Sequence, residues 1–284
     1  MKTGRTGAAR IIRHNGEMIL ILAAASLLVT PEWLQEEQKK GDVVILHAGS
    51  AKDYAEGHVA GARLVTLVDV SKPESKLRLE MPSAELMRER MMLWGIGDQT
   101  RVVIYAGNAS VQTATRIWFT FEYWSLSASL LDGGLAGWKA AGMPVTKDAP
   151  TVIAAKELTV KARPELIVDS TWVRDHLADK QVKILDARLP EFYSGQDAGN
   201  MPRAGHIQGA ASVPYPTLLT EGKAFLPVAA LAEKLGEAGT LVTYCHIGMQ
   251  ATVPYFAARL AGREVKLYDG SFEEWSAKPE LPIN

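Results

Sequence analysis

"VKILDAR", residues 182–188, has a close counterpart earlier in the chain in "VVILHAG", residues 43–49. Each stretch is a short apolar run, rich in β-branched residues, that ends in a polar or glycine-bearing turn, and this is the pattern of a buried strand. The same interval separates Trp33 from Trp172, and each tryptophan lies just after a residue that can cap a helix. A shared interval indicates that the chain contains one structural unit twice.

Further blocks recur in the same order along the two halves of the chain. They are "YAEGHVAGARLV" (54–65) with "RAGHIQGAASVP" (203–214), "VVIYAG" (102–107) with "LVTYCH" (241–246), and "LLDGGLAGW" (130–138) with "LYDGSFEEW" (267–275). The second copy is longer before its Gly-His pair, and we place the insertion in the turn-rich "SGQDAGNMPR" at 194–203. Together with the pair at 43–49 and 182–188, these three pairs make four blocks in one order, and they predict two similar domains.

Helical stretches alternate with the apolar strands in each copy, for example "PSAELMRERMMLWGI" (82–96) and "VAALAEKLGEAG" (228–239). This alternation predicts the α/β class, with two tandem domains that each have a mainly parallel sheet with helices on both faces. We place the domains at residues 27–146 and 164–284. Residues 147–163 have prolines nearby at both ends and no helical period, so we expect an extended linker.

Composition excludes some classes of function. The chain has 284 residues, 47% of them apolar, with 31 Lys and Arg against 32 Asp and Glu, so its formal net charge is -1. A balanced charge gives no broad positive field, and we do not expect a nucleic-acid partner. No run after the N-terminus approaches the roughly 18 apolar residues of a membrane span, so we expect no membrane span. We also expect a monomer.

Residues 1–25 have the composition of a secretory leader. The first 14 residues include four basic side chains and no acidic one, and Met18–Val29 is apolar with a small-residue stretch at Ala23–Ala25. We therefore predict a signal peptide and a periplasmic or otherwise exported protein. The alternative is a cytoplasmic protein in which Met18–Val29 is the first buried segment.

Cys245 is the only cysteine, so it can form neither an intramolecular disulfide nor a thiolate metal cluster. It follows the strand "LVTY" and precedes "QATVPYFAARLAG", whose spacing is helical if Pro254 lies in the first turn. A sharp turn from strand to helix directs several backbone N–H groups inward, and we expect these to lower the pKa of the thiol. The alternative is an inert core cysteine, but Gly248 and the polar turn favour a reactive thiol.

The chain from about Leu27 to Pro282 resembles the tandem-domain rhodanese family of thiosulfate and 3-mercaptopyruvate sulfurtransferases. The resemblance rests on "YAEGHVAGA", "GHIQGA", "YDGSFEEW" and the six-residue loop "CHIGMQ". It implies an inactive N-terminal domain with Ala106 in place of the cysteine, and a catalytic C-terminal domain. Cys245 would then be the nucleophile that forms a persulfide. The family implies no metal and no organic cofactor, and its partners are a small anionic sulfur donor and a thiophilic acceptor such as cyanide or a thiol.

The resemblance also implies which residues bind the donor: His246, Ile247, Gly248, Met249, Gln250 and Arg188. His246 either adds positive charge or is an exposed loop histidine, and Gln250 either donates to donor oxygens or caps the helix. The family's second substrate arginine would fall near Phe192, where there is no positive charge. Arg188 is the candidate to compensate for that absence, but we favour for it a structural ion pair.

The loop "CHIGMQ" has neither the Arg or Lys common in thiosulfate-specific members nor the Gly-Ser-Gly loop of mercaptopyruvate-specific ones. We expect thiosulfate sulfurtransferase activity, with 3-mercaptopyruvate sulfurtransferase and a persulfide carrier as alternatives. A cysteine phosphatase would need an arginine at Ala251. His58 and His206 occur in both copies, so we expect structural roles for them rather than a Cys–His protease pair.

Overall fold

The computed structural model describes residues 12–14, 17–19 and 27–284, except for 42, 109, 110, 156 and 222. The predicted leader at 1–25 lies outside these residues, apart from the backbone of two short strands, β1 (Ile12–His14) and β2 (Glu17–Ile19), which pair antiparallel. Export therefore stays a prediction. Among the described residues, no helix is both long enough and apolar enough to cross a membrane.

The N-terminal domain is built on a five-stranded sheet in the order β3-β7-β6-β4-β5, and every pair in it is parallel. Its strands are β3 (Leu28–Val29), β4 (Val43–Ala48), β5 (Arg63–Val65), β6 (Arg101–Ala106) and β7 (Ala128–Leu131). Its helices are α1 (Pro31–Lys40), α2 (Ala51–Glu56), the 3-10 helix η1 (Leu67–Val70), α3 (Ala84–Leu93), α4 (Val111–Tyr123) and α5 (Gly134–Ala140).

The C-terminal domain repeats this arrangement in the order β8-β12-β11-β9-β10, again with parallel pairs only. Its strands are β8 (Ile167–Val168), β9 (Val182–Asp186), β10 (Ala211–Ser212), β11 (Thr240–Tyr244) and β12 (Val265–Tyr268). Its helices are η2 (Pro164–Leu166), α6 (Ser170–Asp175), α7 (Pro190–Tyr193), η3 (Tyr215–Leu218), α8 (Val228–Leu235), α9 (Thr252–Leu260) and α10 (Ser271–Ser276). The predicted pair of α/β domains is confirmed.

Helices cover both faces of each sheet because the strands are apolar on both sides. In β4, Ile45 faces a cluster that includes Leu34 of α1 and Leu135 of α5, whereas Leu46 faces the cluster that includes Phe119 of α4. Buried strands with two apolar faces are typical of parallel sheets. Trp138 and Trp275, which recur in the two copies, are both buried in such clusters.

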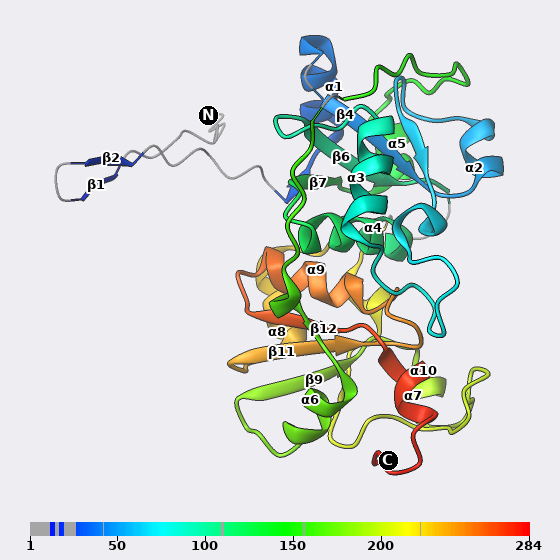
Figure 1. Cartoon of the computed structure of the whole chain (residues 1–284), viewed down its shortest axis with the longest axis vertical. Coiled ribbons are helices and arrows are strands. Elements are labelled where there is room, and N and C mark those ends of the chain that lie inside the picture. Colours follow the sequence, from blue (N-terminus) through cyan, green and yellow to red (C-terminus); the bar gives the residue numbers. More distant parts are fainter. Residues whose placement is uncertain are drawn as a thin grey trace.

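The two domains pack together through α4 and α9, which lie against each other at the centre of the molecule (Figure 1). The rings of Trp118 and Phe256 meet edge to face at a centroid distance of 4.7 Å, and those of Phe119 and Tyr255 do so at 4.8 Å. One continuous apolar cluster therefore extends from one sheet to the other. Such an interface fixes the relative position of the domains, because opening it would expose this apolar surface.

Both repeated helix starts have the predicted caps. The side chain of Thr30 accepts a hydrogen bond from the N–H of Trp33, and that of Asp169 accepts one from the N–H of Trp172. Residues 143–163 form no helix or strand among their described positions. Nevertheless, Leu158 in this segment is buried, and its carbonyl accepts a hydrogen bond from Arg88 of α3 at 3.2 Å, so the connection packs along the N-terminal domain. The domain boundaries themselves stay predictions.

Candidate active site

Cys245 lies in the loop between the carboxyl end of β11 and the start of α9, as the sequence predicts. The loop turns at Gly248, whose φ is +78°, and a Cβ there would lie 2.8 Å from the carbonyl oxygen of Asp269. A side chain at this position would therefore be strained and crowded. The start of α10 holds the first residue of the loop, because Ser271 Oγ accepts a hydrogen bond from the Cys245 N–H at 3.2 Å.

The sulfur of Cys245 is fully buried and faces backbone amides. The N–H groups of Ala251, Ile247 and Gly248 hydrogen-bond to it, and each of them lowers the pKa of the thiol. Burial acts in the opposite direction and is the larger effect, so the pKa of Cys245 is raised. The sequence predicts the amides correctly, but the expected lowering of the pKa is wrong, because desolvation of the thiolate outweighs them.

The alkylation rate of Cys245 should therefore still be rising with pH above about 8.5, the ordinary pKa of a cysteine thiol. The thiolate is the reactive form, and a raised pKa moves its formation to higher pH. The rate can be measured with iodoacetamide on the native chain and on the chain unfolded in urea, where the thiol is solvated. We expect a higher midpoint for the native chain, and a lower one would mean that the amides outweigh burial.

A cavity of about 490 Å³ opens at Cys245. Five of the residues that line it belong to the active loop, and four more come from the predicted insertion: Asp197, Gly199, Asn200 and Met201. Arg78 and Phe192 complete the lining. The insertion occurs in the second copy alone, and this difference in length between the copies is the one feature of the sequence that points to this wall of the cavity.

His246 and Gln250 both line the cavity, and for each residue one of the two predicted roles does not agree with the structure. His246 is half-buried rather than exposed, and burial together with the nearby charge of Arg188 lowers its pKa, so we expect a neutral ring at neutral pH. No side chain caps α9, so the capping role for Gln250 is wrong. The Nε2 atom of His246 and the Oε1 atom of Gln250 are both buried at the wall of the cavity.

Arg188 does not line the cavity. Its guanidinium is buried, forms a forked pair with the carboxylate of Asp186 at 2.6–3.1 Å, and donates to the carbonyl of Gly205 at 2.7 Å. The hydroxyl of Tyr244 donates to the same carboxylate at 2.6 Å. These contacts are those of the structural ion pair that we favoured, and a role in donor binding stays a prediction for Arg188, as it does for the loop residues.

The two repeated histidines make local contacts. Nδ1 of His58 lies 2.9 Å from the carbonyl oxygen of Tyr54, and Nδ1 of His206 lies 2.8 Å from that of Tyr193. Each imidazole also stacks on the ring of the same tyrosine. These contacts fit the structural role expected for both histidines.

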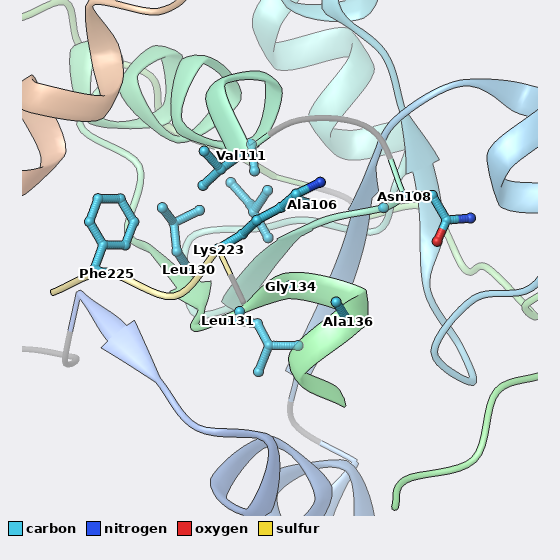
Figure 2. Close-up of a pocket in the computed structure, with 13 residues that line it drawn as sticks. Ala106, Asn108, Val111, Leu130, Leu131, Gly134, Ala136, Lys223 and Phe225 are labelled. Atoms are coloured by element: carbon cyan, nitrogen blue, oxygen red, sulfur yellow. The ribbon is translucent and has the colours of Figure 1, made fainter. Parts of the chain in front are cut away.

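A second, smaller cavity of about 210 Å³ lies at the equivalent edge of the N-terminal sheet, beside Ala106 (Figure 2). Its walls are mostly apolar, with Val111 and Leu130 among them. Lys223 and Phe225, which belong to the C-terminal domain, also line it. This cavity therefore has no sulfur nucleophile, and the partner domain covers part of it.

Comparisons with known proteins agree with this architecture. A family model described as "Rhodanese-like domain" matches residues 30–141 and 169–278. The chain is 26% identical over 273 residues to the 3-mercaptopyruvate sulfurtransferase of Escherichia coli (strain K12), across 90% of this chain and 96% of that protein. It is 25% identical over 295 residues to thiosulfate/3-mercaptopyruvate sulfurtransferase 2 of Arabidopsis thaliana, across 90% of this chain and 86% of that protein.

Among solved structures, the anaerobic ergothioneine biosynthesis enzyme of Chlorobium limicola, in complex with trimethyl histidine, superposes with a TM-score of 0.81. It is 23% identical and the match covers 93% of this chain and 71% of that chain, so this likeness concerns the fold. Because the family model matches both halves and most of the sequence, the chain belongs to the rhodanese-like domain family.

Proposed function

We propose that the protein is a sulfurtransferase that moves a sulfane sulfur from a small anionic donor to a thiophilic acceptor through a persulfide on Cys245. The observation that carries this proposal is the set of three backbone amides that hydrogen-bond to the buried sulfur next to an open cavity. A sulfur that gains negative charge on ionisation needs such donors, since water does not reach it. The names of the relatives support the same class of reaction.

The reaction with thiosulfate balances without a cofactor. The Cys245 thiolate attacks the outer sulfur of thiosulfate, a new S–S bond forms, and the old S–S bond breaks so that sulfite leaves with the electron pair. Cyanide then attacks the outer sulfur of the persulfide with its carbon lone pair. A C–S bond forms, the persulfide bond breaks, and thiocyanate leaves while Cys245 regains its thiolate.

3-Mercaptopyruvate is the second candidate donor, because the Escherichia coli relative carries its name. In that reaction the C–S bond of the donor breaks, and the pyruvate enolate that leaves takes up a proton. Both donors are anions with a transferable sulfur, so both fit the same amide-lined sulfur. We place thiosulfate first and use the comparison of donors as the test.

Steady-state assays with each donor distinguish the candidates. Thiocyanate formation from cyanide with thiosulfate at a higher kcat/KM than with 3-mercaptopyruvate supports the proposal as stated, and the reverse order assigns the second donor. Stoichiometric loading of sulfur without turnover, with cyanide or with a small thiol as acceptor, indicates a persulfide carrier instead. Absence of both loading and turnover contradicts sulfur transfer.

A further inference from the structure

One wall of the cavity at Cys245 comes from the cysteine-free domain. Arg78 lies between η1 and α3 of the N-terminal domain and lines the same cavity as Cys245 and the active loop. Its side chain is 59% exposed. Its charge is also close enough to the active loop to lower the pKa of His246. An arginine from the first copy is therefore part of the site in the second copy.

The segment that carries Arg78 is held at two adjacent residues, one bonded to the C-terminal domain and the other to α4 of its own domain. The Arg78 N–H and Nε donate to the two carboxylate oxygens of Glu273, at 2.9 Å and 2.7 Å. The carbonyl of the next residue, Leu79, accepts a hydrogen bond from the buried guanidinium of Arg116. Arg116 also donates to the carbonyl of Gly248 at 3.0 Å, so the Arg78 segment and the active loop share one anchor.

The contact with Glu273 leaves the terminal nitrogens of Arg78 available. Nη1 and Nη2 make no hydrogen bond among the described residues, whereas Nε is used. These two nitrogens can bind two oxygens of an anion in the forked geometry of a guanidinium. The carboxylate of Glu273 offsets part of the positive charge of Arg78, but it does not occupy Nη1 and Nη2, the donors that would contact an anion.

Arg78 is the one charged basic side chain that lines the cavity within the described part of the chain. His246 has a lowered pKa, and Arg188 is paired with Asp186 outside the cavity. The cavity also contains the carboxylate of Asp197, which accepts a hydrogen bond from the Gly199 N–H at 2.8 Å. Without Arg78, an anionic donor would meet an acidic side chain and no opposing charge.

We infer that Arg78 is a donor-binding residue supplied by the cysteine-free domain, with its terminal nitrogens binding the sulfonate or carboxylate oxygens of the donor while Cys245 attacks the sulfur. The nature of this donor rests on the proposed function. Each domain contributes a basic residue to the cavity of the other, since Lys223 of the C-terminal domain lines the cavity at Ala106. The N-terminal copy would thus take part in the site without a nucleophile of its own.

Alkylation tests the charge of the cavity without requiring sulfur transfer. Because Cys245 is the only cysteine, iodoacetate and iodoacetamide both report on this thiol alone. In Arg78→Gln, the ratio of the iodoacetate rate to the iodoacetamide rate should fall roughly fivefold, since one cation near the thiol is lost. Arg78→Lys should restore most of this ratio. An unchanged ratio in Arg78→Gln contradicts the inference, whether or not the protein transfers sulfur.

Arg101→Gln is the matched control. Arg101 belongs to the same domain, is 60% exposed and forms a salt bridge with Glu37 at 2.9 Å, but it does not line the cavity. The control should keep the wild-type ratio. With the donor that the protein uses, Arg78→Gln should raise KM roughly fivefold to tenfold with a smaller change in kcat. A change in kcat alone, with KM unchanged, would contradict donor binding by Arg78.

Discussion

Replacing Cys245 by alanine is expected to abolish sulfur transfer, with a loss of at least roughly a thousandfold in kcat/KM, because no other sulfur nucleophile exists in the chain. The fold should persist, since the change removes one small buried atom and costs about 1 kcal/mol in the free energy of unfolding. Activity is measured as thiocyanate formation, and stability by urea unfolding. Activity near the wild-type level in Cys245→Ala would contradict the mechanism.

A thiol moved to the other copy provides the control. The double variant Cys245→Ala with Ala106→Cys places the sulfur at the equivalent strand end of the N-terminal domain. We expect no recovered activity, because that cavity is about 210 Å³ and largely apolar. In addition, the loop "GNASVQ" has its glycine at 107, and Ala109 stands at the position that corresponds to Gly248. Recovered activity would show that the loop after Cys245 is not what makes the site.

Replacing Arg116 by methionine is expected to have the largest effect on stability. This guanidinium is 1% exposed and connects Asp269, Gly248 and Leu79, which lie in three separate segments of the two domains. Methionine leaves a largely buried carboxylate and two carbonyls without their donor, and this should lower the free energy of unfolding by about 3 kcal/mol. Sulfur transfer should fall as well, because the active loop loses its anchor.

Urea unfolding of Arg116→Met beside Arg101→Met tests this prediction. Arg101 is an exposed arginine whose one ion pair is with Glu37, and Glu37 keeps Lys40 as a second partner at 2.6 Å, so the replacement of Arg101 should cost less than about 1 kcal/mol. Equal unfolding midpoints for the two variants would contradict the structural role of Arg116. If Arg116→Met is too unstable to purify while Arg101→Met is not, the prediction is also met.

The sequence predicted the parts of this structure that are local. Strand periodicity and turn residues identify β9 and β11, and the helix caps at Thr30 and Asp169 are read directly from residue type. The repeat of these patterns predicted two parallel-sheet domains. The place of Cys245 between strand and helix followed from the same local signals, and so did the amides around it.

The missed features depend on how distant segments meet. Arg78 lies far from Cys245 in sequence, and it reaches the cavity because α4 and α9 pack the two domains together. The sign of the Cys245 pKa shift was wrong for a similar reason. Amides near the thiol follow from the loop, but complete burial of the sulfur results from packing in the whole domain.

The central claim is that Cys245 accepts a sulfur atom from an anionic donor in the amide-lined site. The most direct test is intact-protein mass spectrometry after incubation with thiosulfate, followed by peptide mapping. We expect a mass gain of one sulfur atom, confined to the peptide that contains Cys245 and reversed by cyanide. If 3-mercaptopyruvate alone gives this gain, the donor is reassigned. If neither donor adds sulfur to Cys245, then Cys245 is not the sulfur acceptor and the proposed persulfide mechanism is wrong.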